Sequence, residues 1–201
     1  MVNAEYWSCI EGWFDWESLY KAMVDRCEEG SHFVEVGAWF GKSMCFLATQ
    51  VALLGKQIKL DAVDLWKDTP FEFYNNIISQ VGGDLLPVFM NHMKKAGVDH
   101  LITPLQMSSI EASKLYLDES LDFVFIDADH ETEGVTQDIE HWWPKVKIGG
   151  YLAGHDYQLT TVRAAVDHQF KYVWIFRDSP LCWVIPKESK FVKGQLLPIC
   201  K

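Results

Sequence analysis

The feature that most constrains the fold is a regular alternation of short β-branched runs with segments of helical periodicity from His32 onward. Predicted strands occupy residues 32–36, 58–64, 101–105, 121–127, 149–156, 171–176 and 181–186, and predicted helices occupy about 43–54, 85–96, 110–116, 135–143 and 161–170. Strands that alternate with helices of this length form a parallel sheet with helices on both faces. Because crossover connections are right-handed, the sheet is doubly wound. The sequence therefore predicts an α/β fold.

The last two predicted strands are joined by only four residues, RDSP at 177–180. So short a connection permits an antiparallel hairpin but no helical crossover, and we expect one reversed strand at or near the edge of the sheet. A chain of 201 residues without a linker or repeat is typical of a single domain, 1–201. Within it, residues 1–30 are expected to form a helical cap outside the alternating unit, and residues 66–84 an insertion.

Charge and composition argue against several classes of protein. The formal net charge is −10 and the longest basic cluster is Lys94–Lys95, so the electropositive surface typical of nucleic-acid binding is not expected. No apolar run approaches the roughly 20 residues that span a bilayer, and the start MVNAEYWSC lacks the basic and apolar regions of a secretion signal. The five cysteines are scattered, without a C-x-x-C pair, which favours the cytoplasm. We expect neither nucleic acid nor a membrane as a partner.

In open sheets of this kind, ligands bind at the carboxyl ends of the strands. The first strand ends in EVGAWFGKS (35–43), where Gly37 and Gly41 allow a sharp turn into a helix whose N-terminal amides are free to bind a ligand. Ser43 is placed either to cap this helix or to bind an anionic group. Asp64 ends the second strand, 23 positions after Gly41, where a carboxylate can accept hydrogen bonds from ribose hydroxyls.

Further polar residues follow the later strands. Ser108, after the third strand, is placed to contact an adenine edge or to cap the next helix. The fourth and fifth strands are followed by Asp127, Asp129, His130, His155 and Asp156. Asp127, His155 and Asp156 could jointly hold a divalent cation, since carboxylates suit magnesium and imidazole suits manganese, zinc or iron. Alternatively, Asp127 binds the ammonium group of an organic cofactor.

Two interpretations compete for these positions. The glycine-containing turn is one residue short of the G-x-x-x-x-G-K-[ST] pattern of a Walker A loop, and LDFVFID (121–127) resembles a Walker B strand. A nucleotide hydrolase, however, leaves Asp64 without a role, and the shorter loop cannot surround a β-phosphate in the same way. A ligand that contains a nucleoside and an amino acid but no phosphate, S-adenosylmethionine, satisfies all the positions.

The chain resembles the class I S-adenosylmethionine-dependent methyltransferases over about residues 12–186. Within that superfamily it is similar to the small-molecule O-methyltransferases related to macrocin-type and catechol-type enzymes. EVGAWFGKS is similar to the first motif of that family, and FIDADHETEGVTQDIEHWWPKVKIGGYLAGHDY (125–157) is the most specific part of the resemblance. The resemblance implies a seven-stranded, Rossmann-like sheet whose last strand is antiparallel, and S-adenosylmethionine as cofactor.

The resemblance also implies roles for individual residues. The methionine end of the cofactor would be lined by Glu35, Gly37, Trp39, Gly41 and Ser43. Asp64 would bind the ribose, Ser108 would lie near the adenine, and Asp127 would lie near the cofactor's amino group and any metal. Cation-dependent relatives bind the ion through the residues that match Asp127, His155 and Asp156. The usual pair at the last two positions is Asp-Asp or Asp-Asn, so His155 is a departure that leaves a magnesium requirement open.

Methylation of a hydroxyl requires removal of its proton, by a base or by a metal that lowers the pKa of the hydroxyl. Asp129 and His130 are the candidate bases, with His130 ahead because imidazole titrates near neutrality. The acceptor is expected to be a small molecule, either sugar-like or aromatic. Two aromatic-rich segments, 12–16 and 66–76, are expected either to form a lid over it or to serve core packing or a dimer contact. Two further possibilities stay open: that the protein forms a homodimer, and that it binds the cofactor without catalysing a reaction.

Overall fold

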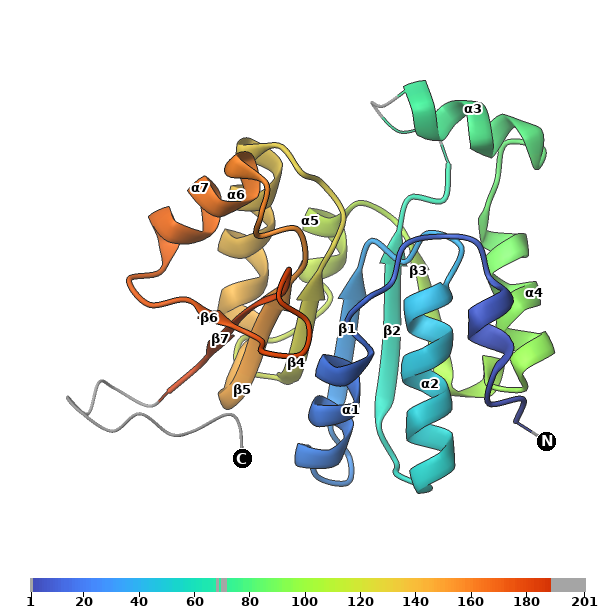
Figure 1. Ribbon diagram of the computed structural model, residues 1–201, viewed down its shortest axis with the longest axis horizontal. Coiled ribbons are helices and arrows are strands. Elements are labelled where there is room, and N and C mark those ends of the chain that lie inside the picture. The colour runs from blue at the N-terminus through green and yellow to red at the C-terminus, as the bar shows by residue number, and fades with distance from the viewer. Residues whose placement is uncertain (1, 68, 70–71, 189–201) are drawn as a thin grey trace.

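The computed structural model describes residues 2–67, 69 and 72–188 of the 201-residue chain. This part contains a seven-stranded sheet of order β3-β2-β1-β4-β5-β7-β6 with helices on both faces (Figure 1). The strands are β1 (His32–Val36), β2 (Lys59–Asp64), β3 (Ile102–Gln106), β4 (Leu121–Ile126), β5 (Val146–Gly154), β6 (Trp174–Ile175) and β7 (Trp183–Pro186). The α-helices are α1 (Glu17–Arg26), α2 (Lys42–Leu54), α3 (Glu72–Gln80), α4 (Leu86–Ala96), α5 (Ser109–Ser113), α6 (Thr132–Trp142) and α7 (Thr160–Gln169). Short 3-10 helices are η1 (Tyr6–Cys9), η2 (Asp99–Leu101) and η3 (Trp143–Lys145).

The sheet has the predicted topology, mostly parallel with one reversed strand. β1 pairs in parallel with β2 and β4, and these pair in parallel with β3 and β5. β7 runs antiparallel to both β5 and β6, which confirms the predicted hairpin. β6 covers only two residues, fewer than the 171–176 predicted.

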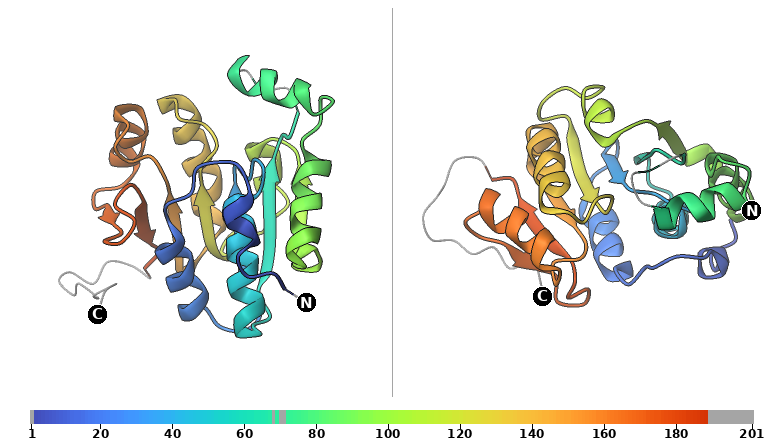
Figure 2. Two further views of the ribbon diagram at one scale, coloured as in Figure 1. Left: turned by 45° about the vertical axis from the view of Figure 1, so that its right-hand side comes forward. Right: turned by 90° about the horizontal axis from the view of Figure 1, so that it is seen from above.

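Two hydrophobic cores enclose the sheet, one on each face. The first lies against α1, α2 and α4, and the second lies against α5, α6 and α7. Adjacent residues of one strand belong to different cores: Phe33 and Phe123 to the first, Val34 and Val124 to the second. This division follows from the alternation of side chains between the two faces of a strand. The view from above in Figure 2 shows the helices on both sides of the sheet.

The N-terminal helix, expected outside the alternating unit, lies within the first core. Tyr20, Met23 and Val24 of α1 are fully buried. The Tyr20 ring packs edge-on against the Phe125 ring of β4, with 5.2 Å between ring centroids. Helix α1 therefore covers the sheet directly, because its apolar face is buried against the β4 side chains.

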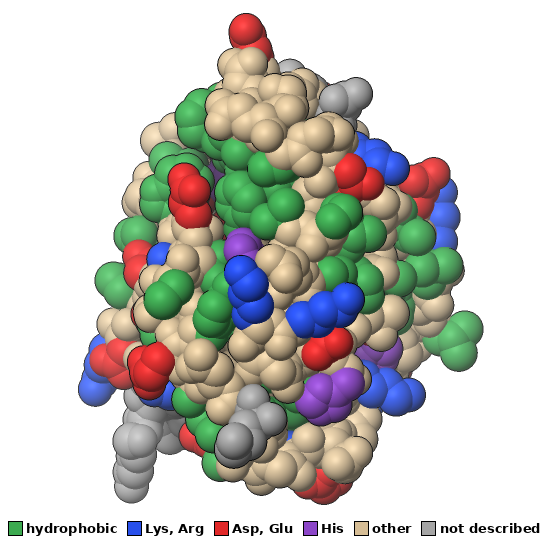
Figure 3. All heavy atoms as spheres, turned by 90° about the vertical axis from the view of Figure 1, so that its right-hand side faces the viewer, with side chains coloured by type: hydrophobic (Ala, Val, Ile, Leu, Met, Phe, Trp, Pro, Cys, Tyr) green, Lys and Arg blue, Asp and Glu red, His purple; other side chains and the backbone are tan. Residues whose placement is uncertain are grey.

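The segment 66–84 contains a helix, α3, that the sequence pattern did not predict. Figure 1 places α3 above the carboxyl edge of β2. Ile78 of this helix is buried, whereas Phe73 is 60% exposed. Figure 3, which faces α4 and α3, shows hydrophobic side chains gathered below the top of the molecule. Residues 68, 70 and 71 of the expected lid lie outside the described residues.

None of the described helices is long and apolar enough to cross a membrane. The described cysteines, Cys9, Cys27, Cys45 and Cys182, are free thiols, and Cys200 lies outside the described residues. Cys45 and Cys182 are buried, so they pack as small apolar side chains.

The ends of β1 and β4 meet at one point of the sheet edge. The Asp127 amide donates to the Val36 carbonyl at 2.8 Å, and the Gly37 amide donates to the Val63 carbonyl at 2.8 Å. A Cβ atom at Gly37 would lie 2.5 Å from the Asp127 carbonyl carbon and would overlap the carbonyl oxygen. Gly37 also has a φ of +94°, a conformation that favours glycine. Glycine is therefore required here both by the backbone conformation and by the close approach of two chains.

Replacing Gly37 with Ala should destabilise the protein more than replacing Gly30 with Ala. Gly30 has a similar φ of +82° but nothing within 4 Å of the added Cβ, so Gly30→Ala measures only the cost of a positive φ at alanine. We expect this change to lower the free energy of unfolding by about 1 kcal/mol. Gly37→Ala adds the overlap with Asp127, for which we expect a further loss of about 2 kcal/mol. Urea unfolding measures both, and equal losses would contradict the close approach.

Candidate functional site

The predicted site residues gather along the carboxyl edge of β1, β2, β4 and β5. Four described non-glycine residues have a positive φ, and three of them lie at this edge: Trp39 at 46°, Trp66 at 50° and Asp156 at 58°. Such conformations are unfavourable for residues with a side chain, and they cluster at functional sites. The edge is therefore the part of the fold where the backbone is held against its local preference.

The loop from Gly37 to Gly41, called the glycine loop below, leads into α2. Gly41 is the N-cap residue, and among the described residues no side chain caps the helix. The first-turn amides of α2 therefore stay available to an anionic group such as a carboxylate. Ser43, predicted either to cap this helix or to bind an anion, instead donates a hydrogen bond to Glu35.

Glu35 of β1 is a buried acid, only 1% exposed. Its carboxyl group accepts hydrogen bonds from the Tyr20 hydroxyl at 2.9 Å and from the Ser43 hydroxyl. Burial raises the pKa of Glu35 to about 8, and the two hydrogen bonds offset only part of this shift. Glu35 and Ser43 therefore form a buried network next to the glycine loop, and their contact with a cofactor stays a prediction.

Asp64 joins the glycine loop to the loop after β2. One carboxylate oxygen accepts from the Trp39 amide and the other from the Trp66 amide, both at 2.8 Å. The Trp66 indole donates in turn to the Trp39 carbonyl at 2.7 Å. Burial raises the pKa of Asp64 although these amides act in the opposite direction. The backbone amides of Ala38 and Leu65 act on the Asp64 carboxylate in the same direction, and its contact with ribose hydroxyls stays a prediction.

Ser108 has a local role in the structure. It is the N-cap residue of α5, where its hydroxyl oxygen accepts from the Glu111 amide. The hydroxyl also donates to the Glu111 carboxylate at 3.0 Å. The structure therefore shows the capping alternative, and a contact with adenine stays a prediction.

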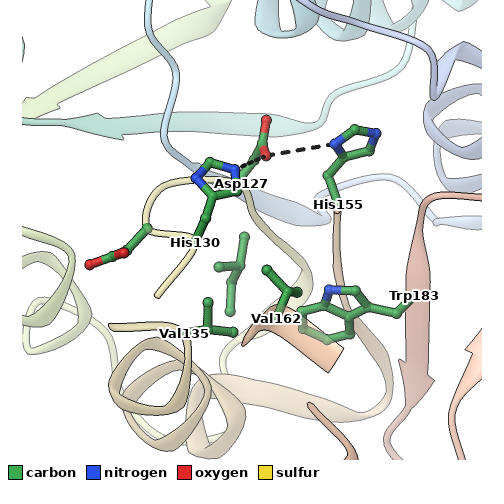
Figure 4. Close-up of a pocket in the computed structure, with 8 residues that line it drawn as sticks. Asp127, His130, Val135, His155, Val162 and Trp183 are labelled. Carbon is green, nitrogen blue, oxygen red and sulfur yellow. Dashed lines mark ion pairs between the residues drawn. The ribbon is translucent and has the colours of Figure 1, made fainter. Parts of the chain in front are cut away.

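Four side chains from the ends of β4 and β5 form a polar group, called here the His-Asp cluster: Asp127, His130, His155 and Asp156. His130 Nε2 lies 2.7 Å from Asp156 Oδ2 and 3.8 Å from Asp127 Oδ1. His155 Nδ1 lies 3.3 Å from Asp156 Oδ2 and 4.0 Å from Asp127 Oδ1. In Figure 4 both imidazole rings turn a nitrogen toward Asp127. Tertiary structure thus unites residues that follow two different strands.

Burial and mutual charge perturb the titration of all four residues. Burial raises the pKa of Asp127 to about 6. For Asp156, burial raises the pKa, but hydrogen bonds with His130 and His155 outweigh it and hold the pKa well below its usual range. The hydrogen bond with Asp156 raises the pKa of His130. For His155, burial lowers the pKa, but the hydrogen bond with Asp156 and the charge of Asp127 outweigh it, so the pKa is raised. Perturbed titration of this kind is typical of functional sites.

The structure adds Asp15, which the sequence analysis did not single out. Asp15 lies before α1, and its Oδ1 is 2.9 Å from His155 Nε2. The neighbouring Trp16 ring lies 4.5 Å from the His155 ring, measured between centroids. Asp15 and His155 are 140 positions apart in the chain, so no local pattern reveals the pair. The one available signal was an acidic residue inside the aromatic segment GWFDW.

Asp129 is directed to the start of α6. Its Oδ1 accepts from the Glu131 amide at 2.8 Å, and a Cβ atom at Gly134 would overlap its carboxylate. Asp129 thus satisfies an amide at the N-terminus of a helix, which is the usual structural use of such a carboxylate. Of the two predicted bases, the structure brings His130 into the His-Asp cluster and leaves Asp129 at its border.

A pocket lies beside the His-Asp cluster. Its lining consists of Ile126, Asp127, Asp129, His130, Val135, His155, Val162 and Trp183. Figure 4 shows Val135, Val162 and Trp183 on one side, with Asp127 and His155 on the other. Trp183 is 1% exposed, and its indole Nε1 has no acceptor among the described residues. The apolar wall therefore offers one N–H donor to an oxygen atom in the pocket.

The cluster has a donor set that fits a divalent cation. Ligand atoms of Asp127, His130 and Asp156 lie within 4.8 Å of one another. His155 Nδ1 has comparable separations from the same two carboxylates. Two carboxylates with an imidazole suit ions from manganese to zinc, and carboxylates alone suit magnesium. The set with all three ligand atoms inside this distance contains His130, and the predicted ligand His155 lies beside the same two carboxylates.

A sequence-family model described as a methyltransferase domain matches residues 34–157, which include the glycine loop, Asp64 and the His-Asp cluster. Among curated proteins, the chain is similar to tapetum-specific methyltransferase 1 of Arabidopsis thaliana. The two are 29% identical over 140 residues, which cover 68% of this chain and 51% of the relative. The chain therefore spans about half the length of the curated relative it matches.

Solved structures share the fold at low sequence identity. The O-methyltransferase NovP is 13% identical with a TM-score of 0.63, and the match covers 87% of this chain and 80% of NovP. An rRNA methylase from Streptococcus thermophilus is 12% identical with a TM-score of 0.61, and the match covers 89% of this chain and 99% of the methylase. The likeness at such identities concerns the fold alone, and the two names differ in the acceptor they indicate.

Glu35 should make the stability of the protein depend on pH. Its pKa is about 8 in the folded protein against an ordinary value of 4.5 for a glutamate, so the folded state binds an extra proton between these values. The stabilisation is therefore complete below about pH 4.5 and is lost as the pH rises through about 8. Glu35→Gln removes the titrating group and keeps the shape. We expect the wild type to lose on the order of a few kcal/mol more than this variant between about pH 5 and about pH 9.

Urea unfolding at a series of pH values measures this difference. Glu28→Gln, a substitution at an exposed position, serves as the matched control and should follow the wild type. Parallel stability curves for the wild type and Glu35→Gln would show that Glu35 does not hold its proton in the folded state.

Proposed function

The chain belongs to the methyltransferase family whose domain model matches residues 34–157, and from this we propose that it transfers a methyl group from S-adenosylmethionine to a hydroxyl of a small molecule. The observation that carries the proposal is the position of the His-Asp cluster beside the glycine loop. The Asp127 amide bonds to the carbonyl of Val36, the residue before Gly37. A site for the methyl donor and a group of acid–base residues therefore adjoin each other.

The methyl donor is proposed to lie along the glycine loop. Asp64, at the carboxyl end of β2, is proposed to accept from the ribose hydroxyls, and the first-turn amides of α2 can bind the carboxylate of the methionine part. Gly37, Trp39 and Gly41 line the path between these two groups. Ser108 stands at the end of β3, the strand next to β2, where the adenine would extend beyond the ribose.

Glu35 and Ser43 are proposed to support the donor site through their buried hydrogen bond next to the loop. Bound S-adenosylmethionine supplies a methyl group on a sulfonium, which is already a good electrophile. The chain must therefore align the acceptor oxygen with the methyl group and exclude water.

His130 is the proposed base. Asp156 accepts from Nε2–H of His130, so the neutral ring carries its lone pair on Nδ1, as when a carboxylate orients the histidine of a catalytic triad. In Figure 4 the second ring nitrogen of His130 points away from Asp127. The side chain is 35% exposed, so an acceptor hydroxyl can reach it. Asp129 is the second candidate, although its carboxylate already bonds to the start of α6.

A divalent metal is part of the proposal. It would be held by Asp127, Asp156 and one of the two histidines. When bound, a metal would lower the pKa of the acceptor hydroxyl. The alternative for Asp127 is a contact with the ammonium group of the cofactor. The position of Asp127 at the end of β4, beside Gly37, is compatible with either role.

The acceptor is proposed to lie between the two aromatic-rich segments. Trp39 links them, because the Tyr74 ring of α3 packs edge-on against it at 5.0 Å between centroids, and a Cβ atom at Gly12 would lie 3.8 Å from Cδ1 of the same ring. Next in the chain to these contacts stand Trp13, 71% exposed, and Phe73, 60% exposed. These exposed aromatic rings near the glycine loop support two proposals. The rings stack on a flat or sugar-like acceptor, and segments 12–16 and 66–84 form a lid over it.

Two further expectations are kept as proposals. A homodimer through the edge strand β6 is supported by Ile175, which is 44% exposed. A location in the cytoplasm is supported by the free thiols of the described cysteines. The family match does not favour the nucleotide-hydrolase alternative.

Calorimetric titration with S-adenosylhomocysteine tests the donor site. The wild type should bind it, and the 2′-deoxy and 3′-deoxy analogues should bind about tenfold more weakly or worse, since a hydrogen bond to a charged group is worth about 1.5–3 kcal/mol. Asp64→Asn should weaken binding and also reduce the discrimination between the ligand and its analogues. General destabilisation would not change that ratio, so the ratio isolates the ribose contact. No binding, or equal affinity for the analogues, would overturn the proposal.

His130→Gln and Asp129→Asn separate the two candidate bases. Turnover is measured as formation of S-adenosylhomocysteine with a panel of catechols and sugars as acceptors. We expect His130→Gln to lower kcat by about 100-fold or more while S-adenosylhomocysteine affinity is retained. Asp129→Asn should keep kcat within a few-fold and lower stability by about 1 kcal/mol, because a helix-end hydrogen bond is weakened. The reverse pattern would assign the base to Asp129.

A further inference from the structure

One buried tryptophan of the pocket, Trp183 of β7, has no hydrogen-bond acceptor. Trp183 is 1% exposed, and its indole Nε1 has no partner among the described residues. Other buried indoles of the chain are paired. Trp66 Nε1 donates to the Trp39 carbonyl at 2.7 Å, and Trp142 Nε1 donates to Ser109 Oγ at 2.8 Å. Buried polar groups without a partner are rare, and each requires an explanation such as a bound molecule or a functional role.

The Trp16 indole is also without an acceptor in the described part of the chain, but it does not line the pocket. Its ring packs against the Phe14 and Phe125 rings in the first core, with 5.0 Å and 5.1 Å between centroids. Trp183 belongs to the second core and lines the pocket. Of these two unpaired indoles, Trp183 is therefore the one whose N–H a ligand can reach.

The backbone of β5 fixes the position of the Trp183 ring. Trp183 pairs with Gly154 across the two antiparallel strands. A Cβ atom at Gly154 would lie 2.5 Å from Cζ2 of the ring, so the ring lies directly against the backbone of the residue before His155. In Figure 4 the indole nitrogen is on the side of the ring that is turned toward the His-Asp cluster. The N–H donor is therefore held at one place next to the cluster.

The starts of two helices form the apolar wall of the pocket. Val135 lies near the start of α6, and Val162 lies near the start of α7. The Thr132 hydroxyl of α6 donates to the Thr161 carbonyl of α7 at 3.1 Å, which joins the two helix starts. Because strands and helices hold these side chains, the pocket has a fixed size and can discriminate between ligands.

The chemistry and size of the pocket determine what can bind to Trp183. An indole N–H only donates, so its partner is an atom that accepts a hydrogen bond. The free space of the pocket holds about one water molecule. A hydroxyl or carbonyl oxygen fits this space, whereas a carboxylate or phosphate group is too large for it. The pocket therefore selects a single neutral oxygen atom.

We propose that Trp183 is a specificity-determining residue whose indole N–H binds a second oxygen atom of the methyl acceptor, in a hydroxyl or carbonyl group. The inference rests on the proposed function. This oxygen lies close to the hydroxyl that is methylated, because the proposed base, His130, lines the same small pocket. While no acceptor is bound, a water molecule takes the place of this oxygen. An acceptor with a C–H group there leaves the buried N–H unpaired, so the chain selects against it.

Nuclear magnetic resonance of the full chain tests binding at Trp183 without any methyl transfer. Isotope-labelled indole nitrogens give one signal for each of the nine tryptophans, and the signal that is lost in Trp183→Phe belongs to Trp183. We expect the Trp183 proton to show a nuclear Overhauser effect to water and its signal to shift when catechol or glucose is added. The signal of Trp66, which is paired with a backbone carbonyl, is the internal control and should show neither.

A Trp183 signal that neither contacts water nor responds to catechol or glucose would overturn the proposal. A contact with water that persists unchanged when these probes are added would show that Trp183 holds an ordered water only, and its role in specificity would be overturned.

Acceptor pairs that differ by one oxygen atom test the specificity itself. Formation of S-adenosylhomocysteine is measured with catechol and phenol, and with glucose and 2-deoxyglucose. We expect kcat/KM of the wild type to favour the member with the second oxygen by about tenfold or more, and Trp183→Phe to reduce this preference about tenfold. Trp142→Phe, the matched control, removes an indole that already donates to Ser109 and should keep the preference. The ratio of two kcat/KM values does not depend on the amount of folded protein, so an unchanged ratio in Trp183→Phe would contradict the proposal.

The same samples are titrated with S-adenosylhomocysteine. Binding of S-adenosylhomocysteine together with a Trp183 signal that ignores both probes would overturn the role of Trp183 and leave the methyltransferase proposal standing. Absence of S-adenosylhomocysteine binding in the wild type would count against the proposed function as well.

Discussion

The close approach of the Gly37 backbone to the Asp127 backbone is the constraint on which the rest of the site depends. β1 lies between β2 and β4, so the chain leaves it toward β2 on one side and the later strands continue on the other. At this switch point the chain leaves β1 and β4 toward helices on opposite faces of the sheet, and ligands of such sheets bind there. Glycine at position 37 lets the two loops touch, which brings the proposed donor site and the His-Asp cluster into contact.

Buried carboxyl groups are a second property of this edge. Burial raises the pKa of Glu35, Asp64 and Asp127, and each carboxyl group has specific partners: hydroxyls for Glu35, backbone amides for Asp64 and imidazoles for Asp127. Burying such groups is unfavourable unless they are hydrogen-bonded or paired. Buried carboxyl groups and positive φ values are both unfavourable for folding. Both are concentrated at the edge of the sheet where ligands are expected.

The sequence predicted the elements with strong periodicity and missed those determined by packing. The mostly parallel sheet with helices on both faces and the reversed β7 followed from the alternating pattern and the four-residue hairpin, and both are confirmed. Helix α3 was missed because its segment is mixed polar and aromatic. The N-terminal helix α1 was expected outside the alternating unit, and its apolar face completes the first core. In the site, Ser108 caps α5, which was one of its two expected roles, whereas the hydrogen bond of Ser43 to Glu35 was not revealed by the spacing of residues.

The sequence by itself determined the α/β fold and the edge of the sheet at which Asp64, Asp127, His130, His155 and Asp156 gather, because these depend on local periodicity and on the parallel direction of strands. Only tertiary structure decided how those side chains are paired. His130 turns to Asp156, Asp129 turns to α6, and Asp15 reaches His155 across 140 residues of chain. Side-chain direction depends on which neighbours are packed against each residue, and contacts between distant segments leave no period in a sequence.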